Sequence, residues 1–170
     1  QAADGAFNAG LVVIAAAGNS GPGSMTVDAP ASARHVLAVG AIDAHASFIN
    51  GTRTVLGFSS RGPTPDGRIK PDLLAPTNVD TANNTSSTAT STFGGTSGAS
   101  PHVTGAAAMW IDWVKLSFPS PEPGQIYANL IAMGGAASAG FDNNQGAGLL
   151  TQSREELIRR ALSALYLFQR

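Results

Sequence analysis

The sequence predicts an α/β fold built on a parallel β-sheet, and three observations support this prediction. Continuous apolar runs at 11–17 and 36–42 are typical of strands buried on both faces, since they do not alternate polar and apolar side chains. The first run ends in a turn rich in glycine and proline at 18–23. A long stretch of small apolar residues at about 97–115 then predicts a helix in the interior. Strands that alternate with helices indicate an α/β architecture.

The other elements are weaker signals and follow in chain order. A helix-like segment at 2–9 leads into the first strand, and short strands are predicted near 54–58 and at 72–75. Residues 77–92 are mostly Ser, Thr, Asn and Ala without periodicity, which predicts a mobile loop with no chemistry of its own. A second helix is predicted at 124–133, with Gly134-Gly135 as its C-terminal stop.

The C-terminal tail has a pattern of its own. Ser153 to Glu156 have the spacing of a capping box, and the apolar residues that follow form a stripe at helical spacing. This predicts a C-terminal amphipathic helix at 151–170, separate from residues 1–150. The helix would pack on its own domain, or dock onto another domain or a partner.

Composition narrows the function classes. A net charge of −1 gives no reason to propose nucleic acid or an anionic membrane as a partner. The longest apolar run, at 9–17, is too short to span a bilayer, and the absence of cysteine rules out disulfides. The first residue is glutamine, which predicts a processing or proteolytic boundary in a longer parent.

The segment Gly94 to Val103 is the strongest candidate for a catalytic site. Its two glycines allow backbone angles closed to other residues, and Pro101 has the fixed φ suited to a first helical turn. Ser97 therefore falls near a helix N-terminus, where a nucleophile would face the positive end of the dipole. A glycine loop with a capping serine explains the same residues. The segment has neither the lysine of a phosphate-binding P-loop nor the last glycine of a Gly-x-Ser-x-Gly elbow.

Asn19 stands where the first predicted strand ends. A carboxamide held rigidly at the C-terminal edge of a buried parallel strand can donate its NH2 hydrogens to a developing oxyanion. An ordinary turn residue is the alternative, because asparagine is frequent in turns.

Two motifs together resemble the subtilisin-like serine proteases, the subtilases. They are Ala15-Ala16-Ala17-Gly18-Asn19-Ser20-Gly21 and Gly95-Thr96-Ser97-Gly98-Ala99-Ser100-Pro101-His102-Val103. Between them, Phe58 to Thr64 and Ile69 to Pro76 also resemble the family pattern. The resemblance covers about 5–150 and implies a subtilisin-like doubly wound parallel sheet with flanking helices, of which residues 1–150 are the C-terminal part.

The resemblance also implies roles for single residues. Ser97 matches the nucleophile, and Asn19 matches the side-chain donor of the oxyanion hole, whose second donor would be the Ser97 backbone N–H. The segment Ala16-Ala17-Gly18 resembles one wall of the pocket for the P1 side chain, and Asp28 matches the pocket floor. A carboxylate there favours arginine or lysine at P1, unless Asp28 points to solvent. Two departures stand out: Gly98, where methionine is commonest, and Thr77, where glycine usually follows Ala-Pro.

The triad is incomplete in this chain. Subtilases order it Asp, His, Ser, and both earlier motifs precede the asparagine segment. Only eighteen residues precede Asn19, and none is histidine. His35 and His45 are expected to be exposed loop residues without a shared metal site, and His102 a packing or hydrogen-bonding residue of the helix. An unactivated serine is a poor nucleophile, so the chain alone is expected to be inactive.

Two functional hypotheses follow. The first is a serine endopeptidase fragment that cleaves polypeptides once a missing N-terminal part supplies Asp and His; the alternative is a noncatalytic subtilase-like module for binding or assembly. Strand 11–17 would have lost parallel neighbours, and such an edge invites homo-oligomers. The family implies secretion. It also often binds calcium, but largely through the part not matched here, so no cofactor or metal site is identified.

Overall fold

The computed structural model describes residues 2–43, 54–115, 120–135 and 141–150. A five-stranded sheet forms its centre, in the order β1-β2-β3-β7-β6. The strands are β1 (Ile14–Ala16), β2 (Leu37–Asp43), β3 (Leu73–Thr77), β6 (Gly134–Gly135) and β7 (Leu149–Leu150). Strands β1, β2, β3 and β7 run parallel, and β6 pairs antiparallel with β7. The predicted α/β class with a parallel sheet is confirmed, as are the strands predicted at 11–17, 36–42 and 72–75.

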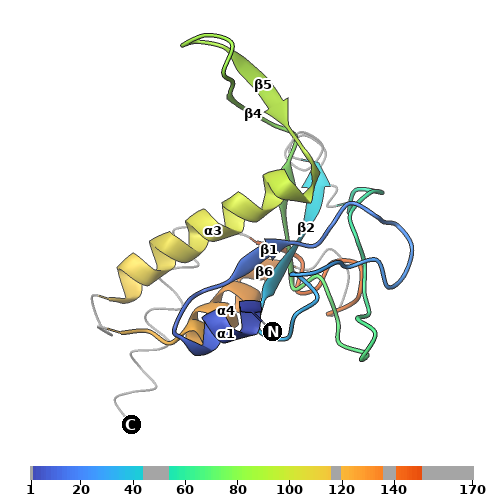
Figure 1. Ribbon diagram of the computed structural model, residues 1–170, viewed down its shortest axis with the longest axis vertical. Coiled ribbons are helices and arrows are strands. Elements are labelled where there is room, and N and C mark those ends of the chain that lie inside the picture. The colour runs from blue at the N-terminus through green and yellow to red at the C-terminus, as the bar shows by residue number, and fades with distance from the viewer. Residues whose placement is uncertain (1, 44–53, 116–119, 136–140, 151–170) are drawn as a thin grey trace.

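Three helices flank the sheet in Figure 1: α1 (Ala2–Asn8), α3 (Gly95–Val114) and α4 (Pro123–Ala132). Helix α3 lies across β1, β2 and β3, and its small buried residues allow close packing, as the sequence predicts. The helices predicted at 2–9, 97–115 and 124–133 are confirmed to within about two residues. The main core lies between the sheet and helices α3 and α4; it includes Leu37, Val39, Leu73, Val103, Trp110, Ile126 and Leu130.

The other face of β2 is covered by the chain at 56–72. A Cβ on Gly40 would lie 2.7 Å from Leu74 Cδ2 and 3.1 Å from Ser59 Oγ, so only glycine fits this close approach. Ser59 is fully buried and accepts a hydrogen bond from the Ala41 N–H at 3.0 Å. Strand β2 is therefore buried on both faces, which explains its continuous apolar sequence.

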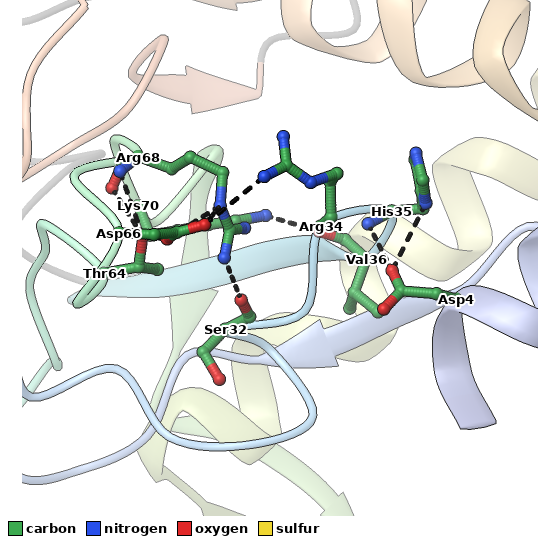
Figure 2. Close-up of polar contacts among 9 residues, drawn as sticks. All are labelled: Asp4, Ser32, Arg34, His35, Val36, Thr64, Asp66, Arg68 and Lys70. Carbon is green, nitrogen blue, oxygen red and sulfur yellow. Dashed lines mark hydrogen bonds and ion pairs between the residues drawn. The ribbon is translucent and has the colours of Figure 1, made fainter. Parts of the chain in front are cut away.

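A buried ion pair joins the beginnings of β2 and β3. The Lys70 ammonium, 3% exposed, donates to the Val36 carbonyl and contacts Asp72 Oδ2, each at 2.6 Å. Asp72 also accepts the Ala38 N–H at 2.7 Å. Burial raises the pKa of Asp72, while the Lys70 ammonium acts in the opposite direction. Figure 2 shows Lys70 beside Asp66 and Arg68, whose ion pair is more exposed. These contacts fix how β3 enters the sheet.

Four local predictions are wrong. Residues 77–92 are not a loop, because β4 (Val79–Ala82) and β5 (Thr90–Phe93) form an antiparallel hairpin that projects from the body in Figure 1. At 54–58 the structure has one isolated bridge, Val55 to Ile42, and not a strand. Gly134-Gly135 forms β6 instead of a helix stop. Pro101 lies inside α3 and not in its first turn.

The hairpin shows why such local predictions fail. It is a backbone ladder whose threonines favour strands, and it has no apolar face for a pattern to reveal. The tail at 151–170 and His45 lie outside the described residues. Within the described residues, no helix combines the length and apolar character needed to cross a membrane.

Candidate active site

Ser97 lies in the first turn of α3, as its third residue, and is exposed. The bend before it depends on Gly95, whose φ of 72° is in the region that favours glycine. The N-cap, Gly94, makes no side-chain cap hydrogen bond, and no acidic residue lies in the first turn. The positive end of the helix dipole therefore acts directly on the Ser97 position.

The Ser97 backbone N–H is available to a ligand. Its neighbours are both engaged: the Thr96 N–H donates to Asn19 Oδ1 at 2.9 Å, and the Gly98 N–H donates to the Gly94 carbonyl at 3.1 Å. Within the described part of the chain, the Ser97 N–H has no acceptor. An unpaired N–H at an exposed helix N-terminus is suited to an anion or to a developing negative charge.

Asn19 reaches this bend from the end of β1. Its Oδ1 accepts from both the Thr96 N–H, at 2.9 Å, and the Thr96 hydroxyl, at 3.0 Å. Because a backbone N–H can only donate, the carboxamide oxygen faces Thr96 and the Nδ2 hydrogens are left free. Asn19 Nδ2 lies 3.2 Å from where a Cβ on Gly95 would be. The carboxamide is thus held in one orientation beside the serine bend, rather than being an ordinary turn residue.

Two further residues hold the turn that presents Asn19. The Thr96 hydroxyl accepts the Gly18 N–H at 3.2 Å, and Ser60 Oγ accepts the Ser20 N–H at 3.1 Å. Gly18 has a φ of 111°, and a Cβ there would lie 2.8 Å from Ser60 Oγ. Sequence reasoning missed both roles. The position of Thr96 immediately before the serine was the available signal for one; nothing local marks Ser60.

Asp28 lies beside the segment predicted to form a pocket wall. Ala17 is fully buried, and its carbonyl accepts the Asp28 N–H at 3.3 Å. Asp28 Oδ2 is 3.5 Å from where a Cβ on Gly18 would be, and the residue is exposed. The structure therefore brings Asp28 next to Ala16-Ala17-Gly18 while leaving its carboxylate open to solvent.

The described histidines do not act on Ser97. His102 Nδ1 lies 2.9 Å from the Gly98 carbonyl, so this nitrogen donates and cannot accept a proton. This confirms the predicted hydrogen-bonding role of His102. His35 is only partly exposed, contrary to prediction, because its ring stacks on Phe7 at a centroid distance of 4.8 Å. The structure describes no cluster of three His, Cys, Asp or Glu side chains suited to a metal ion.

The arrangement suits one chemical task. A carbonyl carbon attacked by Ser97 Oγ would develop negative charge on its oxygen, and two donors, the Ser97 N–H and Asn19 Nδ2, are free to receive it. A group that removes the serine proton is the missing component among the described residues.

Comparisons with known proteins agree on one family. The sequence model of the subtilase family matches residues 1–148. Serine protease AprX of Bacillus subtilis (strain 168) is 49% identical over 76 residues, which are 45% of this chain and 17% of that protein. The extracellular serine proteinase of Thermus sp. (strain Rt41A) is 38% identical over 130 residues, 74% of this chain and 27% of that protein.

The fold comparison gives the same result. Sphericase superposes with a TM-score of 0.73 at 27% identity, over 89% of this chain and 51% of its own. The chain thus spans about half the length of this solved structure, and less of the two relatives in sequence.

Proposed function

Because the chain belongs to the subtilase family of serine proteases, we propose that it carries the nucleophile and the oxyanion hole of a serine endopeptidase. Residues 1–150 would be the C-terminal portion of the catalytic domain. The observation that carries this proposal is the pair of unengaged donors, Ser97 N–H and Asn19 Nδ2, held at one bend. A module that only binds or assembles has no physical need for both.

The Asp and His of the triad would come from an N-terminal part of the domain. Strand β1 is an edge strand of the described sheet, paired on one side with β2 and half-buried along its length. On α3, Met109 is 64% exposed. An edge strand and an exposed apolar side chain are both expected where another part of the same domain packs. Pairing of two copies through β1 is the competing use of this edge.

In the complete domain, Ser97 Oγ attacks the carbonyl carbon of the scissile peptide bond while the histidine accepts the hydroxyl proton. The carbonyl oxygen takes the negative charge and accepts hydrogen bonds from Ser97 N–H and Asn19 Nδ2. The C–N bond then breaks, the proton passes to the leaving amine, and an acyl ester remains on Ser97. Water hydrolyses this ester by the same route. Polypeptides are therefore the proposed substrates, and the family membership favours secretion.

A fluorophosphonate probe tests the proposal directly. The chain is purified alone and together with the preceding part of the domain, each beside its Ser97→Ala variant, and the intact mass of every polypeptide is measured. We expect one adduct, on Ser97, only where the N-terminal part is present. An unlabelled Ser97 in the complete domain would contradict the proposal and favour the noncatalytic module.

Asp28 is proposed to select a basic P1 side chain. Its carboxylate borders Gly18 and is open to solvent, so an arginine that enters along Ala16-Ala17-Gly18 would meet it. Asp28→Asn is expected to lower kcat/KM for an arginine P1 peptide by about 10- to 100-fold, the worth of a hydrogen bond to a charged group. A phenylalanine P1 peptide should be affected little.

The matched control is Asp112→Asn, which removes the same charge from an exposed position on α3. Kinetics of the complete domain on paired Arg and Phe peptides provide the measurement. Equal wild-type cleavage of the two peptides would show that Asp28 does not form the pocket floor.

A further inference from the structure

Thr77 reaches the serine bend from the end of β3. The side chain is fully buried, and its hydroxyl donates to the Gly95 carbonyl at 2.7 Å. Gly95 is the residue with a φ of 72°, two positions before Ser97. A buried hydroxyl of a neighbouring strand therefore contacts the bend at the residue where its backbone turns.

Gly98 follows the serine and leaves room for that hydroxyl. A Cβ on Gly98 would lie 2.5 Å from Thr77 Oγ1 and 3.0 Å from the Phe93 carbonyl. The first distance is shorter than real Cβ contacts, and Thr77 cannot swing aside without breaking its bond to Gly95. The two departures from the family pattern, a threonine at 77 and a glycine at 98, thus occupy one space.

We propose that Thr77 is a positioning residue for the Ser97 nucleophile and that Gly98 is its required packing partner. The inference rests on the proposed protease function. The bend would then be held from two strands: from β1 through the bonds of Asn19 and Gly18 to Thr96, and from β3 through the bond of Thr77 to Gly95. Ser97 comes directly after both anchored residues, so its Oγ and N–H inherit their placement.

The role is one of orientation more than of folding. The Gly95 carbonyl lies at the start of α3, where helix geometry also supplies an N–H one turn later. Loss of the Thr77 hydroxyl would leave this carbonyl paired and remove only the direction that β3 imposes. Misplacement of a nucleophile lowers the rate of the chemical step more than it weakens substrate binding.

The first test uses Thr77→Val and Thr77→Ser in the complete catalytic domain. Valine keeps the shape and removes the hydroxyl, so kcat is expected to fall about 5- to 10-fold with KM unchanged. Serine keeps the hydroxyl and is expected to stay within about twofold of the wild type. Equal kcat values for wild type and Thr77→Val, or a loss confined to KM, would overturn the positioning role.

The second test measures the coupling of the two positions without relying on activity. Gly98→Ala is made in the wild type and in a Thr77→Ala background, and Tm is measured for all four proteins. We expect Gly98→Ala to lower Tm by several degrees when Thr77 is present and by clearly less when it is absent. Gly5→Ala is the control, since Gly5 is exposed on α1 and a Cβ there meets nothing within 4 Å.

The two tests separate this inference from the proposed function. An equal Tm loss from Gly98→Ala in both backgrounds would overturn the packing pair, whatever the activity. A wild-type domain that fluorophosphonate does not label would contradict the protease function and the positioning role together. Normal labelling of the wild type with an unchanged Thr77→Val would contradict the positioning role alone.

Discussion

Ser97→Ala is expected to lower the kcat of the complete domain on peptide substrates by about a million-fold, which is the factor known for the nucleophile of subtilisin, a member of the same family. Alanine removes the only atom that forms the acyl ester. The backbone N–H of residue 97 and the carboxamide of Asn19 remain, so substrate binding and a small residual rate from the oxyanion hole should persist.

Steady-state kinetics and fluorophosphonate labelling check this result. The matched control is Ser91→Ala, which removes an exposed hydroxyl from β5, close to the site in sequence but outside the bend. Its kcat is expected to equal that of the wild type. Turnover by Ser97→Ala above the level of a contaminating protease would show that another residue is the nucleophile.

The location of the site could be predicted because its main signals are local. An apolar run followed by Gly18-Asn19 places the asparagine at the C-terminal edge of a parallel strand, and the glycines before Ser97 place the serine at a helix start. Ligand sites of parallel sheets gather at that edge. Two motifs separated by 78 positions, from Asn19 to Ser97, could therefore be expected to meet.

The supporting contacts could not be predicted, because each joins residues far apart in the chain. Gly18 meets Thr96 across 78 positions, Ser20 meets Ser60 across 40, and Thr77 meets Gly95 across 18. Hydroxyl side chains are common in this sequence, and no periodicity distinguishes the buried ones. The same limit applies to Thr77 and Gly98, which look like unrelated departures until the structure places them in contact.

Asn19→Leu is expected to reduce the kcat of the complete domain by about 100- to 1000-fold with little change in KM. This range is the known effect of removing the corresponding oxyanion donor from subtilisin, and family membership extends it to this chain. The donor acts on charge that exists only in the transition state, so ground-state binding should not depend on it. Leucine has a similar volume, but it also leaves the Thr96 N–H without its acceptor.

Two further variants separate donation from support. Asn19→Asp keeps an oxygen for Thr96 but cannot donate, so its loss of kcat should equal or exceed that of Asn19→Leu. Thr96→Val removes the hydroxyl that binds Asn19 Oδ1 and the Gly18 N–H while leaving the Thr96 N–H in place, and about a tenfold loss is expected. An Asn19→Asp enzyme with normal kcat would mean that Asn19 only shapes the bend, and the Ser97 N–H would then be the sole donor from this chain.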